Sequence, residues 1–235
     1  METLFLKGMR WDCPDSDEFP FNLPVVRGNR ELKFSQRVTF LVGENGSGKS
    51  TLLEAIAVAM GFNPEGGSKN FNFSTRDSHS VLSDYVTPIR GPRAPKDGYF
   101  LRTENLYNMA SYIDEIGGQY SYGGVSLHDM SHGESLLAML QHRFSPKGIY
   151  LFDEPECALS PIGLFKLLRL IHDLAAEGAQ FIIATHSPII LACPGAEVLE
   201  FSGQEILPVD YKDSEPYLLY KRFFEDEGFV QRIIQ

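Results

Sequence analysis

The stretch GENGSGKST, residues 43–51, has the residue types and the spacing of a loop that holds phosphate groups. It fits the pattern G-x-x-x-x-G-K-[ST], whose glycines let the backbone fold so tightly that successive N–H groups point at phosphate oxygens. In this pattern the Lys49 ammonium bridges the β and γ phosphates and the Ser50 hydroxyl ligates Mg²⁺. The sequence therefore predicts a nucleoside triphosphate site formed by Gly43, Glu44, Asn45, Gly46, Ser47, Gly48, Lys49, Ser50 and Thr51.

Two adjacent acids, Asp153 and Glu154, follow the apolar run 149–152. If that run is a strand, the acids emerge at the carboxyl edge of a sheet, where α/β folds bind their ligands. There Asp153 can anchor hydrated Mg²⁺, and Glu154 can accept a proton from the water that attacks the γ phosphate. The alternative is an acidic pair that caps the following helix. The phosphate loop upstream favours the catalytic interpretation.

A histidine, His186, ends the apolar run of IIATHSP. A lone histidine is more often structural than catalytic, but one beside phosphate chemistry can hydrogen-bond the γ phosphate or orient the attacking water. Together with the loop and the acids, it leads us to predict Lys49, Glu154 and His186 as the catalytic residues.

The segment MSHGES, residues 130–135, allows two interpretations. Ser131 and Glu134 have the spacing of a capping box, in which each side chain bonds the backbone N–H of the other residue at a helix start. Serine and glycine at a helix start also present a hydroxyl and N–H groups to an anion. The same residues can therefore hold a phosphate that is bound by another chain.

Strands that alternate with helices must position these residues. We expect strands at 38–42, 149–152 and 179–184, and helices over 49–60, from 131 to about 144, and over 161–177. This alternation predicts a mostly parallel α/β sheet in one domain, residues 1–235. We expect a nucleotide-binding lobe at about 1–61 and 145–235, and an insertion with a helical lobe at about 62–144.

Other segments complete the expected elements. Residues 25–33 have the pattern of a strand, a Gly-Asn turn and a strand, and residues 62–100, rich in Gly, Ser, Asn and Pro, that of an irregular or β-hairpin insertion. A helix over 105–116, a turn over 117–124 and two short strands over 195–209 follow. The final amphipathic helix, 216–234, is expected to pack on its own domain, with docking of a partner as the alternative.

Composition narrows the function classes. The formal net charge of −10 argues against a broad nucleic-acid footprint, although the loop IRGPRAPK, residues 89–96, carries basic residues and no acid. No apolar stretch approaches the roughly 20 residues that span a bilayer, and the start lacks the pattern of a signal peptide. Three scattered cysteines indicate reduced thiols. We therefore expect a cytoplasmic protein without a membrane segment.

With these motifs in this order, the chain resembles an ABC-type ATPase head, most closely the soluble group related to the SMC, RecF and OLD proteins. GENGSGKSTLLEAIA is similar to their Walker A motif and IYLFDEPECALSP to their Walker B motif with the following D-loop. ATHSP is similar to their switch-histidine strand and MSHGE to their LSGGQ-like signature. Within the group, the chain looks like a family of small, free-standing ATPases.

The resemblance implies a P-loop NTPase fold with additional antiparallel strands, with ATP and Mg²⁺ as cofactors. It also implies an ATP-dependent homodimer that encloses two ATP molecules, each held by one phosphate loop and by the opposite signature, Ser131, His132, Gly133 and Glu134. ATP hydrolysis would then act on a separate effector protein or on DNA, in repair or defence.

The chain departs from the family pattern at several positions. His132 stands where the signature has glycine, Glu134 where it has glutamine, and Ser160 where the D-loop has aspartate. Glu104 is the best substitute for the glutamine that approaches the metal between the two motifs. For Trp11 and Phe21 we expect core packing, with stacking on adenine as the alternative.

Two rival functions stay open. A nucleotide-binding subunit of a membrane transporter has the same motifs, but the residues that follow the signature, the acids and the histidine differ from that class. A zinc site at HDMSH, residues 128–132, nearly matches H-E-x-x-H, but a helix start at Ser131 would break the continuous turn that the two histidines need.

Overall fold

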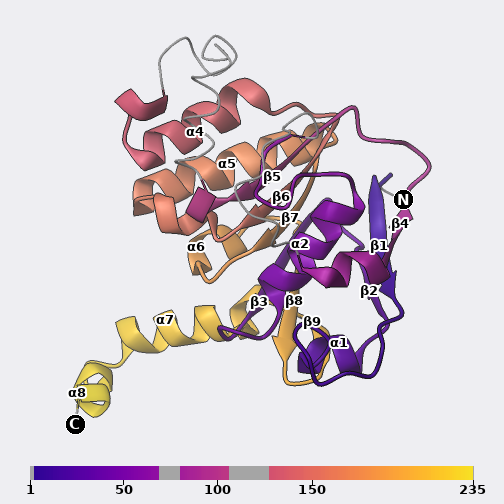
Figure 1. Ribbon diagram of the computed structural model, residues 1–235. Coiled ribbons are helices and arrows are strands. Elements are labelled where there is room, and N and C mark those ends of the chain that lie inside the picture. Colours follow the sequence, from indigo (N-terminus) through magenta and orange to yellow (C-terminus); the bar gives the residue numbers. More distant parts are fainter. Residues whose placement is uncertain (1–2, 69–79, 106–126, 235) are drawn as a thin grey trace.

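A six-stranded sheet lies at the centre of the computed structural model, which describes residues 3–68, 80–105 and 127–234 (Figure 1). Its strands, in spatial order, are β5 (Asp97–Arg102), β6 (Gly148–Asp153), β7 (Gln180–Ala184), β3 (Val38–Gly43), β8 (Glu197–Ser202) and β9 (Glu205–Val209). The first five run parallel, and β9 is antiparallel to β8. The prediction of a mostly parallel sheet with added antiparallel strands is confirmed.

A second, three-stranded sheet places β1 (Leu6–Trp11) between β2 (Glu31–Lys33) and β4 (Val86–Arg90) in antiparallel pairing. Gln180, fully buried at the start of β7, joins the two sheets. Its amide oxygen accepts hydrogen bonds from the N–H groups of Phe5 and Leu6 at 2.9 Å each, and its amide nitrogen donates to the Leu6 carbonyl at 2.7 Å. Because buried polar groups need partners, Gln180 fixes where β1 begins relative to the central sheet.

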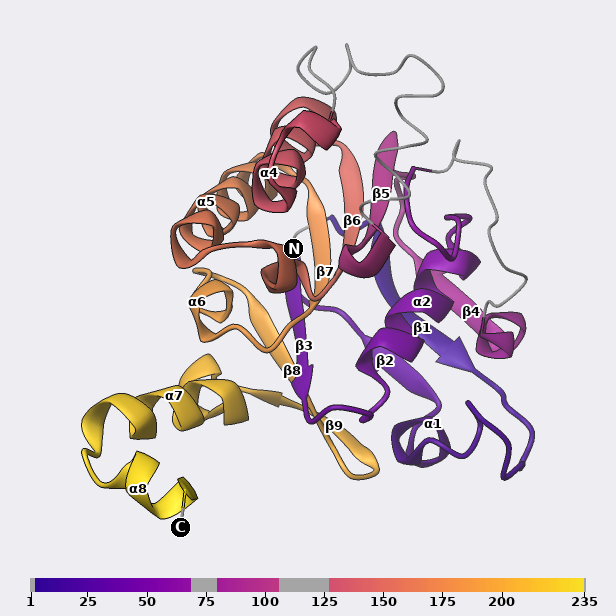
Figure 2. The same cartoon turned by 60° about the vertical axis from the view of Figure 1, so that its left-hand side comes forward.

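Helices cover both faces of the six-stranded sheet (Figure 2). α2 (Lys49–Ala59) lies between the two sheets and buries Leu52, Leu53 and Ile56 there. α4 (His132–Arg143), α5 (Pro161–Glu177) and α6 (Pro188–Leu191) cover the opposite face, with Leu136 and Leu167 in a second core. The parallel strands therefore end at the edge where α2 begins, which is the edge at which such folds bind ligands.

The predicted final helix is two helices. α7 (Glu215–Glu225) and α8 (Phe229–Ile234) project from the body of the molecule (Figure 1). Asp226 ends α7 in an extended conformation, and its side chain accepts a hydrogen bond from the Gly228 N–H at 3.1 Å. A side chain that bonds the backbone two residues on is an Asx turn, so the segment 226–228 interrupts the helical pattern.

One other expectation is wrong, and the β-hairpin alternative for residues 62–100 is excluded for their described part. Residues Pro24–Gly28 form a helix, α1, instead of a strand, because proline at the first helical position has the φ value that a helix requires and lacks only an N–H that would be unpaired there. The segment 62–100 forms no hairpin in its described part, because β4 pairs with β1 and β5 pairs with β6. Strands from this segment thus extend both sheets.

The other predicted helices and strands are found close to their expected bounds. Short 3-10 helices connect them at Val81–Tyr85, Thr103–Asn105, Leu127–Asp129, Pro155–Ala158 and Tyr211–Asp213. The helix expected over 105–116, beyond its first residue, and the turn expected over 117–124 lie outside the described residues. The division into two lobes stays a prediction.

Candidate nucleotide site

The phosphate loop connects the end of β3 to the start of α2, as predicted. Gly43, Gly46 and Gly48 have φ values of 139°, 79° and 100°, which disfavour residues with a Cβ. A Cβ at Gly43 would lie 2.5 Å from the Phe201 carbonyl oxygen, and one at Gly48 would lie 2.9 Å from Cγ2 of Val25. The glycines are therefore needed both for the turn and for its close approach to neighbouring elements.

Lys49 is buried at the base of this loop. Its ammonium donates hydrogen bonds to the carbonyls of Gly43 and Glu44, both at 2.8 Å. Burial lowers the pKa of Lys49, and the carboxylates of Glu154 and Asp153 oppose this shift. Among the described residues, the buried Ser47 hydroxyl has no hydrogen-bond partner. A cation and an unpaired hydroxyl at a glycine loop suit an anionic ligand with several oxygens.

The two predicted metal ligands lie together. The Ser50 hydroxyl donates to Oδ1 of Asp153 at 2.8 Å, although 103 residues separate them in the sequence. Burial raises the pKa of Asp153, and the hydrogen bond from Ser50 opposes this shift. Both residues line a hollow of about 530 Å³, together with Glu104 and Glu154. Hydroxyl and carboxylate oxygens are the ligands that Mg²⁺ prefers, so this pair fits the metal.

Glu154 has an unusual backbone conformation. Its φ of 47° is the one positive value among the described residues other than glycine, and such a conformation costs about 1–3 kcal/mol. Three hydrogen bonds hold the peptide: the Glu154 N–H donates to the Ala184 carbonyl at 3.0 Å, and the Thr103 hydroxyl donates to the carbonyls of Asp153 at 3.1 Å and Glu154 at 2.9 Å. These bonds hold the backbone of Glu154 in this conformation at the carboxyl edge of the sheet.

His186 lies beside this carboxylate, with Nε2 3.8 Å from Oε1 of Glu154. Burial lowers the pKa of His186, as does the nearby charge of Lys49. The ring is therefore neutral at pH 7, and its buried Nε2 has no hydrogen-bond partner among the described residues. A neutral imidazole with a free nitrogen next to a carboxylate can bond a phosphate oxygen or a water molecule.

Glu156 contacts the candidate site but was not among the residues predicted from the sequence. Its Oε1 accepts a hydrogen bond from the backbone N–H of His186 at 2.6 Å. Burial raises the pKa of the Glu156 carboxyl. This hydrogen bond connects the turn 155–158, which follows the two acids, directly to His186 after β7. The spacing of 30 residues between the two gave no local signal of this contact.

Arg102 and Thr103, at the end of β5, were also missed. Arg102 pairs with Glu54 of α2 at 2.7 Å and with Glu104 at 2.6 Å. These contacts place Glu104 at the rim of the hollow that Ser50 and Asp153 line, with its carboxylate bonded to arginine. Their position depends on β5 lying next to β6, which the sequence pattern did not predict.

The signature segment opens α4 with a complete capping box. The Glu134 N–H donates to Oγ of Ser131 at 3.3 Å, while the Glu134 carboxylate accepts from the Ser131 N–H at 3.0 Å and from its hydroxyl at 2.7 Å. These bonds lower the pKa of Glu134. A Cβ at Gly133 would lie 2.8 Å from the Ala158 carbonyl oxygen, so glycine is needed where α4 meets the turn 155–158. In the described part of the chain, no hydrogen bond joins 131–134 to the phosphate loop.

The remaining candidates have structural roles or lack support. The Trp11 indole is buried and donates to the Val26 carbonyl at 3.0 Å, and Phe21 packs edge-on against Tyr85 in the same core. Both fill the core, which is the role expected for them. His128 lies in a 3-10 helix that ends at Asp129, before α4 begins, and the described residues contain no cluster of potential metal ligands. The continuous helical turn that a zinc site of His128 and His132 would need is therefore not formed.

Family models match two parts of the chain. An AAA domain model matches residues 21–96, and a model described as "AAA domain, putative AbiEii toxin, Type IV TA system" matches residues 120–192. The fold is similar to that of cbiO1 from Clostridium perfringens, part of the ABC transporter complex cbiONQ, with a TM-score of 0.51, 17% identity and coverage of 100% of both chains.

The cytochrome c biogenesis ATP-binding export protein CcmA of Rhodopseudomonas palustris is 30% identical, covering 71% of this chain and 90% of the relative. The chain belongs to the ABC-type P-loop ATPases. An SMC head domain from Thermotoga maritima also matches 88% of this ATPase and 99% of that domain, with a TM-score of 0.47 and 18% identity. Within the described residues of the ATPase, none of the helices is both long and apolar enough to cross a bilayer.

Proposed function

We propose that two copies of this ATPase enclose two ATP molecules, and that the signature of each copy binds the nucleotide held by the other. The observation that carries this proposal is the exposed Ser131 at the start of α4, with no hydrogen bond to the phosphate loop in the described part of its own chain. A hydroxyl and the first backbone N–H groups of a helix suit a phosphate that another chain presents.

Each copy's own residues would bind and orient the nucleotide. The N–H groups of the loop 43–51 and the Lys49 ammonium would bind the phosphates, in place of the loop carbonyls that Lys49 now contacts. Ser50 and Asp153 would hold Mg²⁺, with Glu104 as a further ligand after release from Arg102. When bound, Mg²⁺ supplies neutralisation of negative charge at the γ phosphate.

Glu154 and His186 would act on the attacking water. The Glu154 carboxylate, held by its strained backbone, would accept a proton from that water at Oε1 or Oε2. His186 would use its unpaired Nε2 to hold the γ phosphate or the water in line. From the second copy, Ser131, His132, Gly133 and Glu134 would complete the site, with Ser131 on the γ phosphate.

The ATP-driven closure would act on a separate partner. The description of one matching family model names a putative toxin of a toxin–antitoxin system. This description supports a defence-like role in which the partner is an effector protein. The net charge of −10 makes DNA a weaker candidate, one that binding to duplex DNA with ATP across a salt series would test. An affinity that did not fall with salt would exclude a phosphate-backbone contact.

A second candidate function is the nucleotide-binding subunit of a membrane transporter in the cytoplasm. The name of the 30% identical relative, an ATP-binding export protein, favours it. Co-purification of a membrane protein with the native ATPase would support this function. Absence of the ATPase from membrane extracts would count against it.

Mixing two inactive variants tests the shared site. Lys49→Ala removes the phosphate contact, and Ser131→Asp keeps an oxygen that caps α4 but adds a negative charge toward the γ phosphate. Each variant alone should lack ATPase activity, whereas a mixture should recover up to about a quarter of the wild-type rate, since half of the dimers are mixed and each has one intact site of two. Ser131→Thr, which keeps hydroxyl and cap, is the active control. No recovery on mixing, or full activity of Ser131→Asp alone, would contradict the proposal.

A further inference from the structure

The C-terminal helices expose many apolar side chains. All residues from 218 to 225 of α7 are exposed, so none of the side chains in this part of the helix is fully buried against the body of the molecule. We define the C-terminal apolar strip as the large exposed residues of α7 and α8: Leu218, Leu219, Tyr220, Phe223, Phe224, Val230, Ile233 and Ile234. Phe224 and Ile234 are 75% and 77% exposed.

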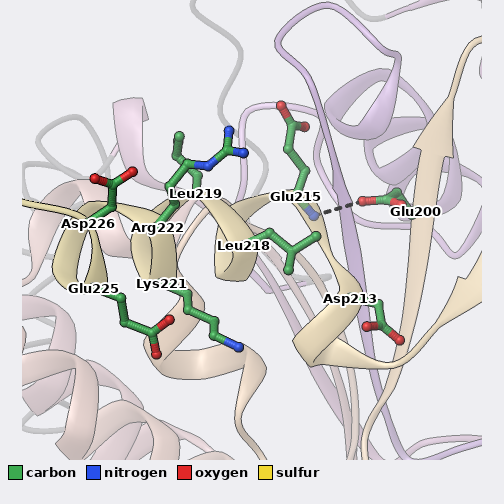
Figure 3. Close-up of a pocket in the computed structure, with 9 residues that line it drawn as sticks. All are labelled: Glu200, Asp213, Glu215, Leu218, Leu219, Lys221, Arg222, Glu225 and Asp226. Atoms are coloured by element: carbon green, nitrogen blue, oxygen red, sulfur yellow. Dashed lines mark hydrogen bonds between the residues drawn. The ribbon is translucent and has the colours of Figure 1, made fainter. Parts of the chain in front are cut away.

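Hollows flank α7 on both sides. One, of about 820 Å³, lies toward β8 and is lined by Glu200, Leu218 and Leu219 among others (Figure 3). The other, of about 800 Å³, lies toward α5 and α6 and is lined in part by Tyr220 and Phe224. Of the packing on its own domain that the sequence predicted for the final helix, α7 shows buried or half-buried residues only up to Tyr217, and the residues after it are exposed.

Such a helix needs a partner. Isolated helices shorter than about 12–15 residues are marginal in water, and most helical stability comes from burying an apolar face. α7 has 11 residues and α8 has 6. The strip also places large aromatic rings in water, where exposed contiguous apolar patches usually mark interaction sites.

The charges of the segment favour a second copy of the chain as this partner. Lys221 and Arg222 precede the pair Phe223 and Phe224, and the acids 225–227 follow it. Figure 3 shows Lys221 and Glu225 extending from the same side of α7. Asp226 pairs with Arg232 of its own chain, which leaves Lys221 and Glu225 as the complementary charges. Two such helices that cross antiparallel beside Phe224 would place Lys221 of each against Glu225 of the other. The balanced charge suits neither an anionic lipid surface nor nucleic acid.

The area is also sufficient. A large apolar side chain has roughly 200 Å² of accessible surface, and about half of it is exposed on each of the eight residues of the strip. Together they present about 800 Å², which is the area that one partner contributes to a standard stable interface. Ile162 and Phe165, 70% and 60% exposed at the start of α5, add apolar surface next to the hollow that Phe224 lines. The same hollow is lined by residues of the turn 155–160 and by His186. In the proposed ATP dimer the second copy lies against this part of the molecule, and in this respect the inference rests on the proposed function.

We propose that the C-terminal apolar strip joins two copies of the chain through α7 and α8, and that this contact forms without nucleotide. The two ATP-binding heads then remain close to each other throughout the hydrolysis cycle. Two-fold symmetry fits this contact because the same strip serves both copies and its charges are complementary to themselves. ATP would close the heads of an existing dimer.

Sedimentation equilibrium of the full chain without nucleotide tests this contact. The wild-type protein should be a dimer, and the double variant Phe223→Glu, Phe224→Glu should raise the dissociation constant by about 100-fold or more, because both aromatic anchors are lost. Phe19→Glu changes an equally large, 64% exposed phenylalanine elsewhere and is the matched control. Far-UV circular dichroism and ATP binding would verify that each variant is folded.

A charge exchange provides a second measurement. Lys221→Glu should weaken the dimer, and Lys221→Glu with Glu225→Lys should restore it, because the exchanged charges again face each other across the two-fold axis. A wild-type protein that is monomeric without nucleotide but dimeric with ATP overturns this inference and leaves the proposed function standing. A monomer that binds vesicles of anionic lipid through α7 overturns it in favour of a membrane surface. A nucleotide-free dimer in which the mixed Lys49 and Ser131 variants recover no activity supports this inference and overturns the proposed function.

Discussion

Replacing Glu156 tests whether the turn after the acids positions His186. In Glu156→Ala the backbone N–H of His186 loses its acceptor, the Glu156 Oε1 at 2.6 Å. A hydrogen bond to a charged group contributes about 1.5–3 kcal/mol, and the donor left behind is only partly able to reach water. We expect the free energy of unfolding to fall by about 2 kcal/mol, and the melting temperature to fall by about 4–8 °C for a domain of this size.

Glu156→Gln is the matched control, because it keeps an oxygen acceptor and removes the charge. Burial raises the pKa of Glu156 above its value in the unfolded chain, so the folded state binds this proton more readily. This group therefore adds stability as pH falls through the raised pKa and costs stability above it. Glu156→Gln should be at least as stable as the wild type at pH 8 and should lose this pH dependence.

Denaturant unfolding and steady-state ATP hydrolysis measure the two effects. Glu156→Ala should lower kcat by about tenfold or more, because misplacing a group that orients the water weakens catalysis even without a direct contact to it. Glu156→Gln should keep most of kcat. Wild-type stability together with wild-type kcat in Glu156→Ala would refute the reasoning.

Three further predictions concern the sheets, the signature and pH. Gln180→Ala removes the bonds that join β7 to Leu6 and should lower the unfolding free energy by about 3 kcal/mol or more in denaturant titrations; a loss below about 1 kcal/mol would contradict the role of Gln180. Glu134→Gln removes a negative charge that would face the triphosphate bound by the second copy. Head closure can be followed by fluorescence energy transfer between the two heads in the Glu154→Gln background, and the ATP concentration for half-maximal closure should fall several-fold in Glu134→Gln. An unchanged ATP requirement would count against the shared site. Because the pKa of His186 is lowered, kcat should be constant down to about pH 6.5 and fall only at lower pH, where stability that depends on the neutral ring is also lost; an acid limb unchanged in His186→Gln would assign the fall to another group.

Most of the nucleotide site could be predicted from local sequence patterns. The loop 43–51 contains its own geometry, because its glycines and lysine are adjacent in sequence and act through one turn. The acids at the end of β6 and the histidine after β7 followed from apolar runs that end in polar residues. Ser131 and Glu134 likewise form the capping box that their spacing predicted.

Contacts between distant segments could not be predicted in this way. Arg102 lies opposite Asp153 because β5 pairs with β6, and nothing in the Pro- and Gly-rich residues before β5 specifies that neighbour. The bond from His186 to Glu156 depends equally on how two loops meet. At α1, the β-branched pair Val25 and Val26 indicated a strand, but the preceding Pro24 and their burial under the phosphate loop favour a helix. The exposure of the C-terminal apolar strip was also invisible in the periodicity, which is the same for a docked helix and an undocked one.

Titration calorimetry with ATP and millimolar Mg²⁺ tests the central claim most directly. The wild-type protein should bind one ATP per chain, and the heat of binding should disappear in Lys49→Ala, while Phe19→Glu should bind as the wild type does. Asp153→Asn should bind ATP with an affinity that no longer depends on Mg²⁺, since one of the two paired metal ligands has lost its charge. Absence of ATP binding by the folded wild-type protein, or equal binding by Lys49→Ala, would contradict the account.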